Sequence, residues 1–207
     1  MAGTDTTAQV GRPREFDHEA VLDTVVDLFW DRGFGATSMG DIVARTGLSK
    51  SSLYGAFGSK DALFETALDR YLADHRRTID EILTNGSKGL DDIDVFFSGV
   101  EEQAGLTERR GCLAVNTATE RRTTEPALVQ MSARHRDAMR DGFTAALTRA
   151  VDLGVVDADQ IDDLSNLLVT TALGLAVMIG GGAPTDEVLA HLASARASLR
   201  SGRGSAE

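Results

Sequence analysis

Apolar residues recur along the chain at the three- and four-residue spacing that places side chains on one face of a helix. The first such stripe lies within residues 17–32 and consists of Leu22, Val25, Val26 and Phe29. Asp17 is placed to cap the first turn, and Gly33 is placed to end the helix. These residues predict an amphipathic helix of about four turns with one buried face.

Capping residues predict three further helices. A Ser-x-x-Asp box at Ser38 and Asp41 opens a very short helix that Thr46-Gly47 ends. Ser49 caps a second short helix, and Gly58-Ser59 ends it and caps a longer amphipathic run. We expect these three helices to end near Arg45, Phe57 and Leu83.

A turn-rich break at residues 85–89 precedes a second series of helices. This series is expected at residues 90–105, 112–122, 125–154, 159–180 and 185–199. Strict alternation of apolar and polar residues, the pattern typical of strands, is rare in the chain. The sequence therefore predicts an all-α fold, with a small N-terminal three-helix unit and a larger C-terminal helical domain.

The segment 159–180 is apolar nearly all round, which indicates a buried helix. The charge-free stretch 164–185 is also long enough to raise the alternative of a membrane helix. Polar residues such as Asn166 and the glycines at 180–182 dilute its hydrophobicity, and no basic cluster flanks it. We favour a protein–protein contact for this segment over a membrane span.

The overall charge argues against a nucleic-acid partner, but its distribution does not. The formal net charge is −11, and residues 61–183 contribute twelve Lys/Arg against twenty-one Asp/Glu. Within residues 38–60 the balance reverses, because Arg45, Lys50 and Lys60 face only Asp41. One cysteine closes no intramolecular disulfide, and the polar N-terminus lacks an apolar signal core, so we expect a cytoplasmic protein.

The two short helices around Thr46-Gly47-Leu48 have the dimensions of a helix-turn-helix unit. In such units the N-terminal end of the second helix points at the base edges of DNA. Here that end carries Ser49, Lys50, Ser51, Ser52 and Tyr54. Hydroxyl groups and backbone N–H groups at a helix start bind phosphate well, and a lysine adds a salt-dependent charge contact. This surface therefore has the chemistry of a DNA contact.

The sequence around this unit resembles the N-terminal DNA-binding domain of the TetR family of transcriptional regulators. The residues that carry the resemblance are Gly33-Phe34-x-x-Thr37-Ser38-Met39-x-x-Ile42-Val43 and Gly47-Leu48-Ser49-Lys50-Ser51-Ser52-Leu53-Tyr54-x-x-Phe57-Gly58-Ser59-Lys60-Asp61-x-Leu63-Phe64. The resemblance spans roughly residues 11–71. It implies a three-helix DNA-binding domain fused to a helical domain that dimerises through its last two helices and holds a small-molecule pocket. Ligand binding would then release DNA.

On this resemblance, ten residues are expected to contact DNA. Thr37, Ser38, Tyr54 and Lys60 would contact phosphate, and Ser49, Lys50, Ser51 and Ser52 would lie in the major groove. Arg12 and Arg14 resemble the basic arm of many members, which enters a minor groove. Gly55-Ala56 and Gly58 depart from the commonest family pattern, in which an aromatic residue, a histidine and a basic residue are frequent. Modest affinity with a steep dependence on dimerisation is expected.

The resemblance also sets the expected domain boundaries and dimer contacts. These are an N-terminal arm at 1–15, the helix-turn-helix domain at 16–60, a connecting helix at 61–84, the ligand-binding and dimerisation domain at 85–200 and a tail at 201–207. The long helix 60–83 is expected to transmit the ligand signal. The expected dimer residues are Leu164, Leu168, Thr171, Leu175, Val188, Leu192, Ala195 and Leu199.

A ligand pocket is expected among the helices between Leu90 and Ile179. Its candidate lining combines apolar bulk with a few polar groups: Phe96, Phe97, Cys112, Asn116, Glu120, His135, Met139, Phe143 and Met178. The stretch 111–117 resembles a TetR subgroup with members that sense electrophiles or oxidants through a cysteine. Arg109, Arg110 and a helix N-terminus would favour the Cys112 thiolate, while the simpler interpretation is a small buried hydrophobic residue.

The sequence offers no metal site, cofactor motif or catalytic motif. The four histidines are scattered, and no nucleophile elbow or phosphate-binding loop is present. We therefore expect a cytoplasmic homodimeric regulator, most simply a ligand-released repressor that binds a near-palindromic operator, and not an enzyme. An electrophile-responsive repressor is the alternative. Two remote alternatives are a helical enzyme or small-molecule carrier with a vestigial helix-turn-helix, and a pure interaction protein.

Overall fold

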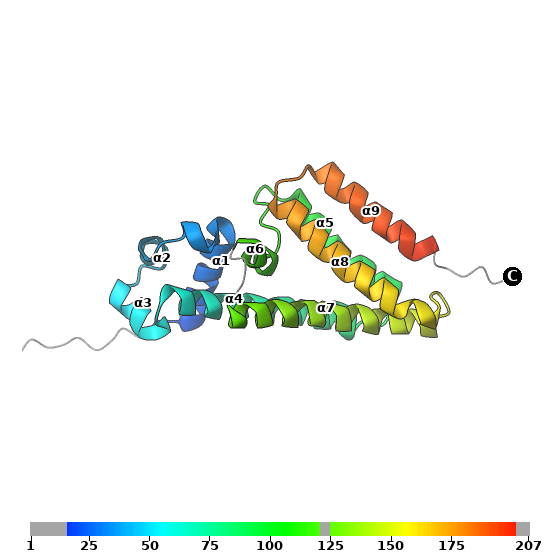
Figure 1. The fold of residues 1–207 in the computed structure, drawn as a ribbon, viewed down its shortest axis with the longest axis horizontal. Coiled ribbons are helices and arrows are strands. Elements are labelled where there is room, and N and C mark those ends of the chain that lie inside the picture. Colours follow the sequence, from blue (N-terminus) through cyan, green and yellow to red (C-terminus); the bar gives the residue numbers. More distant parts are fainter. Residues whose placement is uncertain (1–15, 121–124, 202–207) are drawn as a thin grey trace, which may run out of the picture.

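The computed structural model describes residues 16–120 and 125–201, and these residues form helices and turns without a strand (Figure 1). The α-helices are α1 (His18–Ala36), α2 (Met39–Thr46), α3 (Lys50–Phe57), α4 (Lys60–Ile79), α5 (Leu90–Gly105), α6 (Leu113–Glu120), α7 (Pro126–Asp152), α8 (Ile161–Gly180) and α9 (Thr185–Ser201). A π-helical turn at Asp80–Thr84 and a 3-10 turn at Ala158–Gln160 complete the elements. The all-α fold class is confirmed.

The N-terminal helices begin and end where the sequence predicts. The Asp17 carboxylate accepts hydrogen bonds from the N–H groups of Glu19 and Ala20, at 3.0 and 3.2 Å. Gly33 leaves the helical conformation with φ 75°, so it breaks α1 one turn before its last residue. Ser38 and Asp41 form the predicted capping box, and Gly47 ends α2 with φ 69°. Local side-chain chemistry therefore accounts for the helix-turn-helix unit.

The helix α4 belongs to both hydrophobic cores of the molecule. Phe64 and Tyr71 of α4 pack with Phe29 and the other buried residues of α1–α3. The last residue of α4, Ile79, and Leu83 in the π-helical turn pack with the C-terminal helices. In Figure 1, α4 and α7 run side by side along the length of the molecule and join the two ends.

A partly buried ion pair fixes the junction between the π-helical turn, α5 and α7. The Asp92 carboxylate accepts hydrogen bonds from the N–H groups of Lys88 and Gly89, at 2.8 and 3.0 Å. Arg149 of α7 reaches the same carboxylate at 3.2 Å. The Arg149 guanidinium also donates to the carbonyl oxygens of Leu83 and Thr84. The ion pair thus supplies hydrogen-bond partners both to carbonyl groups at the end of the π-helical turn and to N–H groups just before α5.

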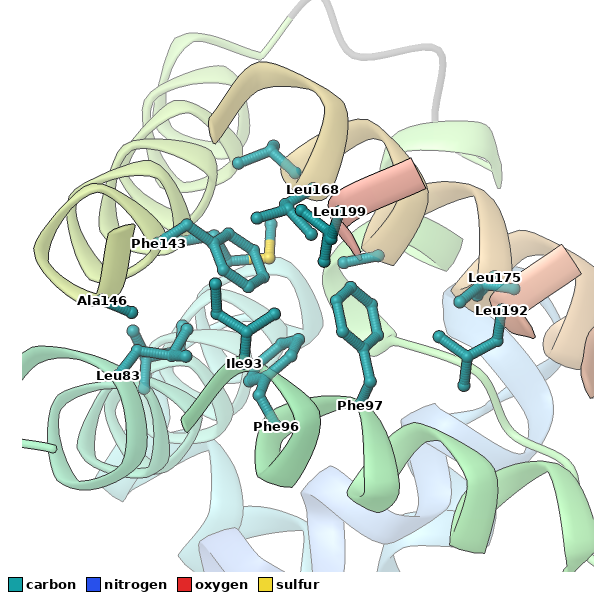
Figure 2. Close-up of a cluster of buried hydrophobic side chains, with 14 of the residues drawn as sticks. Leu83, Ile93, Phe96, Phe97, Phe143, Ala146, Leu168, Leu175, Leu192 and Leu199 are labelled. Carbon is teal, nitrogen blue, oxygen red and sulfur yellow. The ribbon is translucent and has the colours of Figure 1, made fainter. Parts of the chain in front are cut away.

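The C-terminal core corrects the expected dimer residues (Figure 2). Leu168 and Leu175 of α8 point into this core beside Phe97 and Phe143, and Leu192 and Leu199 of α9 close it. Val188 is also fully buried within the protomer, while Leu164, Thr171 and Ala195 are half-buried. Five of the eight residues therefore stabilise the protomer itself. The apolar stripe was correctly assigned to a buried face, but the partner of that face is the rest of the same chain.

A different apolar face of α8 and α9 is exposed. Leu167, Val177 and Leu189 are 42%, 50% and 38% exposed. Within the described residues, segment 158–180 is long and apolar enough to cross a membrane by length and composition. In this structure α8 packs against α5, α6, α7 and α9, which leaves one side of the helix uncovered.

Candidate DNA-binding surface and effector cavity

The exposed start of α3 forms a small hydroxyl-rich surface. The Ser49 hydroxyl accepts a hydrogen bond from the Ser52 N–H at 3.1 Å and lies 2.9 and 2.8 Å from the hydroxyl oxygens of Ser51 and Ser52. Leu53, on the opposite side of α3, is fully buried and anchors the helix. The predicted groove residues therefore share one exposed helix end, with side chains that donate and accept hydrogen bonds.

Lys50 and Tyr54 extend this surface along α3. Tyr54 is 42% exposed, and the Lys50 ammonium lies 5.8 Å from the centre of its ring. Ser38, at the start of α2, is also exposed. An exposed ammonium and a phenolic hydroxyl on one helix face suit phosphate oxygens. The contacts with DNA themselves stay predictions.

Two of the residues expected to contact phosphate make hydrogen bonds within the domain. Thr37 is 1% exposed, and its hydroxyl donates to the Gly33 carbonyl oxygen at 2.7 Å. The Lys60 ammonium donates to the Phe34 carbonyl oxygen at 2.7 Å and lies 4.0 Å from the centre of the Phe34 ring. Both side chains thus stabilise the turn between α1 and α2. Arg12 and Arg14, with the whole predicted arm, lie outside the described residues.

A small cavity of about 50 Å³ lies between α4, α5, α6, α7 and α8. Apolar side chains make up most of its lining, and the polar groups come from Tyr71, His75, Gln103, Cys112 and His135. An open groove of about 200 Å³ between α6, α7 and α8 shares Val115, His135 and Leu173 with the cavity. Because these three side chains line both, the surface groove adjoins the cavity.

Burial favours the uncharged forms of the two histidines and the tyrosine of the cavity. Burial lowers the pKa of His75, and burial together with His75 and Arg136 lowers the pKa of His135 to about 3. Burial and the neighbouring Cys112 raise the pKa of Tyr71. Among the described residues, the buried Nδ1 atom of His75 has no hydrogen-bond partner. A neutral ring nitrogen without a partner favours a ligand that carries an uncharged hydrogen-bonding group.

The low pKa of His135 predicts a specific pH dependence of stability. The unfolded chain binds a proton at this histidine below about pH 6.5, and the folded chain does so only near pH 3. Stability is therefore lost as pH falls from about 6.5 toward 3, with a slope of about 1 kcal/mol per pH unit for this residue. Urea unfolding at several pH values should show a shallower slope for His135→Gln. His191→Gln, on the exposed side of α9, is the control, and equal slopes for all three proteins would contradict the assignment.

Cys112 lies at the N-terminal end of α6 but is 8% exposed. Its sulfur accepts a hydrogen bond from the Tyr71 hydroxyl at 3.5 Å and lies 3.8 Å from Nε2 of His135. Arg110, which was expected to favour the thiolate, forms ion pairs with Asp27 and Asp31 of α1 instead. The electrophile-sensing alternative is therefore not favoured, and the simpler interpretation of a buried polarisable residue fits these contacts.

Four of the nine expected pocket residues line the cavity: Phe96, Cys112, His135 and Met139. Phe97 and Phe143 are buried in the C-terminal core, and Met178 packs against it. Asn116 donates from its amide to the Arg110 carbonyl oxygen at 2.8 Å. Glu120 is exposed and contacts α1. The last five residues are thus placed outside the cavity.

Sequence reasoning missed the contribution of α4 to the cavity. Tyr71 and His75 are four residues apart, which places them on one face of the helix. That pair of polar aromatic residues within an amphipathic helix was a usable signal. It was overlooked because the segment was interpreted only as a connection between domains.

Comparisons with known proteins agree with this architecture. Residues 21–67 match the family model described as bacterial regulatory proteins, tetR family. The chain is 28% identical to the uncharacterised HTH-type regulator YezE of Bacillus subtilis, over 88% of this chain and 96% of that protein. It is 45% identical to the HTH-type transcriptional repressor ComR of Escherichia coli, over 33% of this chain and 35% of that protein.

A solved structure extends the likeness to nearly the whole chain. A structure of a cysteine mutant of the TetR family regulator CifR, described as complexed with 26-base-pair double-strand operator DNA, superposes with a TM-score of 0.77. The two sequences are 28% identical, and the match covers 90% of this chain and 99% of that one.

A helix-turn-helix with an exposed polar recognition helix, joined to a larger helical domain, defines a DNA-binding transcriptional regulator. The family match and the structural likeness add the specific assignment. Residues 21–67 carry the DNA-binding domain of the TetR family, and over most of its length the chain resembles TetR family transcriptional regulators.

Proposed function

We propose that this protein is a cytoplasmic homodimeric repressor that a small molecule releases from a near-palindromic operator. The observation that carries the proposal is the exposed hydroxyl-rich start of α3, with Lys50 and Tyr54 beside it. Residues 61–183 carry most of the net negative charge, so the regulator binds DNA through α2 and α3 with the acidic domain turned away. ComR and other relatives named as repressors support this direction of control.

The proposed dimer forms through the exposed apolar face of α8 and α9. On α8 this face consists of Leu167, Thr170, Gly174 and Val177, which recur at helical spacing on one side. On α9 it includes Leu189 and Ala193. Pairing this face with its copy covers exposed apolar residues in both protomers and places two recognition helices on one DNA duplex.

The proposed effector is a small molecule without a formal charge. The cavity presents neutral hydrogen-bonding groups, because burial keeps His75 and His135 unprotonated. A charged ligand would find no opposite charge among the cavity-lining residues and would lose its hydration. A hydroxyl or carbonyl group reaching His75 fits the unpartnered nitrogen.

Selection of bound fragments from a random DNA pool tests the proposal. The purified protein is expected to enrich an inverted repeat with half-sites about one helical turn, roughly 10 base pairs, or a multiple of that apart. Enrichment of a single half-site would contradict the dimer. Absence of any enriched sequence at low salt would overturn the assignment of the operator.

Replacing Tyr54 with Ala tests the phosphate contact on α3. Loss of a hydrogen bond to a charged oxygen is expected to weaken binding about tenfold, to operator and to unrelated DNA alike. Tyr54→Phe should show most of this loss if the hydroxyl makes the contact. Lys50→Ala should in addition reduce the slope of affinity against salt, because only the lysine releases a counterion. Unchanged affinity in Tyr54→Ala, measured by fluorescence anisotropy, would contradict the role of this residue.

A further inference from the structure

The short helix α6 lines the cavity through Val115 and packs against α1 of the DNA-binding domain, beside which it lies in Figure 1. Val115 lines both the cavity and the surface groove, and Ala118 and Thr119 line the groove. On its other side α6 packs against α1. A single helix of eight residues therefore contacts the proposed effector site and the DNA-binding domain at the same time.

Two polar anchors hold this region to α1. Before α6, the Arg110 guanidinium pairs with Asp27 at 2.8 Å and Asp31 at 2.6 Å. At the last residue of α6, the Glu120 carboxylate accepts hydrogen bonds from two backbone N–H groups. These belong to Phe34 at 3.0 Å and Gly35 at 2.7 Å. The second anchor ends at the turn that leads into the helix-turn-helix unit.

The turn at residues 33–35 is shaped for this carboxylate. A Cβ atom on Gly33 would lie 2.8 Å from one carboxylate oxygen of Glu120, and a Cβ atom on Gly35 would lie 3.0 Å from the other. Gly33 has φ 75°, a conformation that favours glycine. The absence of side chains at both positions lets the carboxylate approach the backbone, where two N–H groups meet its two oxygens.

The same turn sets the position of α2. The Phe34 carbonyl oxygen accepts from Lys60 of α4, and the Gly33 carbonyl oxygen accepts from the Thr37 hydroxyl. Thr37 directly precedes Ser38, the residue that caps α2. A shift of this turn is therefore passed to the start of the helix-turn-helix unit through buried or partly buried contacts.

We propose that Glu120 is a positioning residue for DNA binding, whose contact with the 33–35 turn holds α2 and α3 in the DNA-binding arrangement. The proposal rests on the proposed function and deepens it, because it names the contact that the effector breaks. A ligand that displaces Val115 moves α6, and the Glu120 carboxylate then leaves the two N–H groups. The free turn no longer fixes the spacing of the recognition helices in the dimer.

Operator affinity of Glu120→Ala and Glu120→Gln tests the proposal. Glu120→Ala is expected to weaken operator binding about tenfold, because two charge-assisted hydrogen bonds are lost, and Glu120→Gln should fall between it and the wild type. Loss of the Glu120 charge alone would reduce repulsion from DNA and strengthen binding. The weaker operator binding expected for Glu120→Ala therefore cannot be a general effect of net charge. Glu102→Gln, on the exposed side of α5, is the matched charge control. Unchanged or tighter operator binding by Glu120→Ala would overturn the proposal.

A double-mutant cycle with Gly35→Ala separates this contact from a general loss of stability. The added methyl group would lie 3.0 Å from a Glu120 carboxylate oxygen and push it away from the backbone N–H groups, so Gly35→Ala alone is expected to weaken operator binding. In the Glu120→Ala background the same substitution should have little further effect. Additive losses would contradict a shared contact.

The amide resonances of Phe34 and Gly35 give a readout that does not depend on DNA. In the free wild-type protein both amide protons are expected downfield and slow to exchange, and Glu120→Gln should shift them and speed their exchange. If the shifts change while the wild type binds no palindromic DNA, the proposed function fails and the contact stands. If the wild type binds its operator and neither the amide signals nor the affinity depends on Glu120, the contact fails and the function stands.

Discussion

Replacing Val177 with Asp is expected to convert the dimer to a monomer and to weaken operator binding by about 100-fold or more. Val177 is 50% exposed in the protomer and lies on the face of α8 assigned to the dimer. A carboxylate buried against its own copy would lose hydration without a partner. Sedimentation or light scattering should report the monomer, and circular dichroism should report unchanged helix content.

A neighbouring residue provides the control for this prediction. Leu175, two residues earlier on α8, is buried in the protomer core. Leu175→Ala is expected to lower the free energy of unfolding by about 2–5 kcal/mol. The folded Leu175→Ala protein should dimerise more strongly than the Val177→Asp variant. A Val177→Asp variant that remains dimeric would show that another surface forms the dimer.

Replacing Asp92 with Ala is expected to lower the free energy of unfolding by about 3 kcal/mol. The substitution leaves the partly buried Arg149 guanidinium without its carboxylate and removes the acceptor for the Lys88 and Gly89 N–H groups. The junction between the π-helical turn, α5 and α7 then carries unsatisfied polar groups. Urea denaturation measures the change directly.

Asp91 supplies the matched control for Asp92. It precedes Asp92 in the first turn of α5 and is exposed, so Asp91→Ala removes the same charge from the same end of the helix. Asp91→Ala is expected to lower the free energy of unfolding by less than about 1 kcal/mol, because it removes only the interaction of an exposed carboxylate with the helix N-terminus. Similar losses for both variants would show that helix charge, rather than the buried pair, explains the effect.

The sequence predicted the parts of the fold that depend on neighbouring residues. Asp17, Ser38 and Ser49 cap helices at the expected positions because each side chain bonds to the backbone within three residues. Gly33 and Gly47 end helical conformation for a similarly local reason, their positive φ angles. The exposed start of α3 followed from the same local rules.

The parts that depend on distant contacts could not be predicted in the same way. The stripes of α8 and α9 indicate that Leu168 and Leu192 are buried, but helical spacing does not say whether the partner is the same chain or a copy. Glu120 was grouped with the pocket as one of the few polar residues among the apolar candidates between Leu90 and Ile179. Its carboxylate instead bonds to backbone groups some eighty-five residues earlier, a pairing that no pattern in the sequence marks.

The dual role of α4 restricts how a protein of this design acquires a new effector. Phe64 and Tyr71 pack in a cluster with Leu113 of α6 and Met131 of α7, so the N-terminal core is completed by the C-terminal helical domain. An exchange of whole domains between relatives would place mismatched side chains across this shared core. Substitutions at cavity positions such as Val100 or Leu173 avoid that mismatch. Evolution of effector specificity is therefore expected to proceed by point substitution within one lineage rather than by recombination of domains.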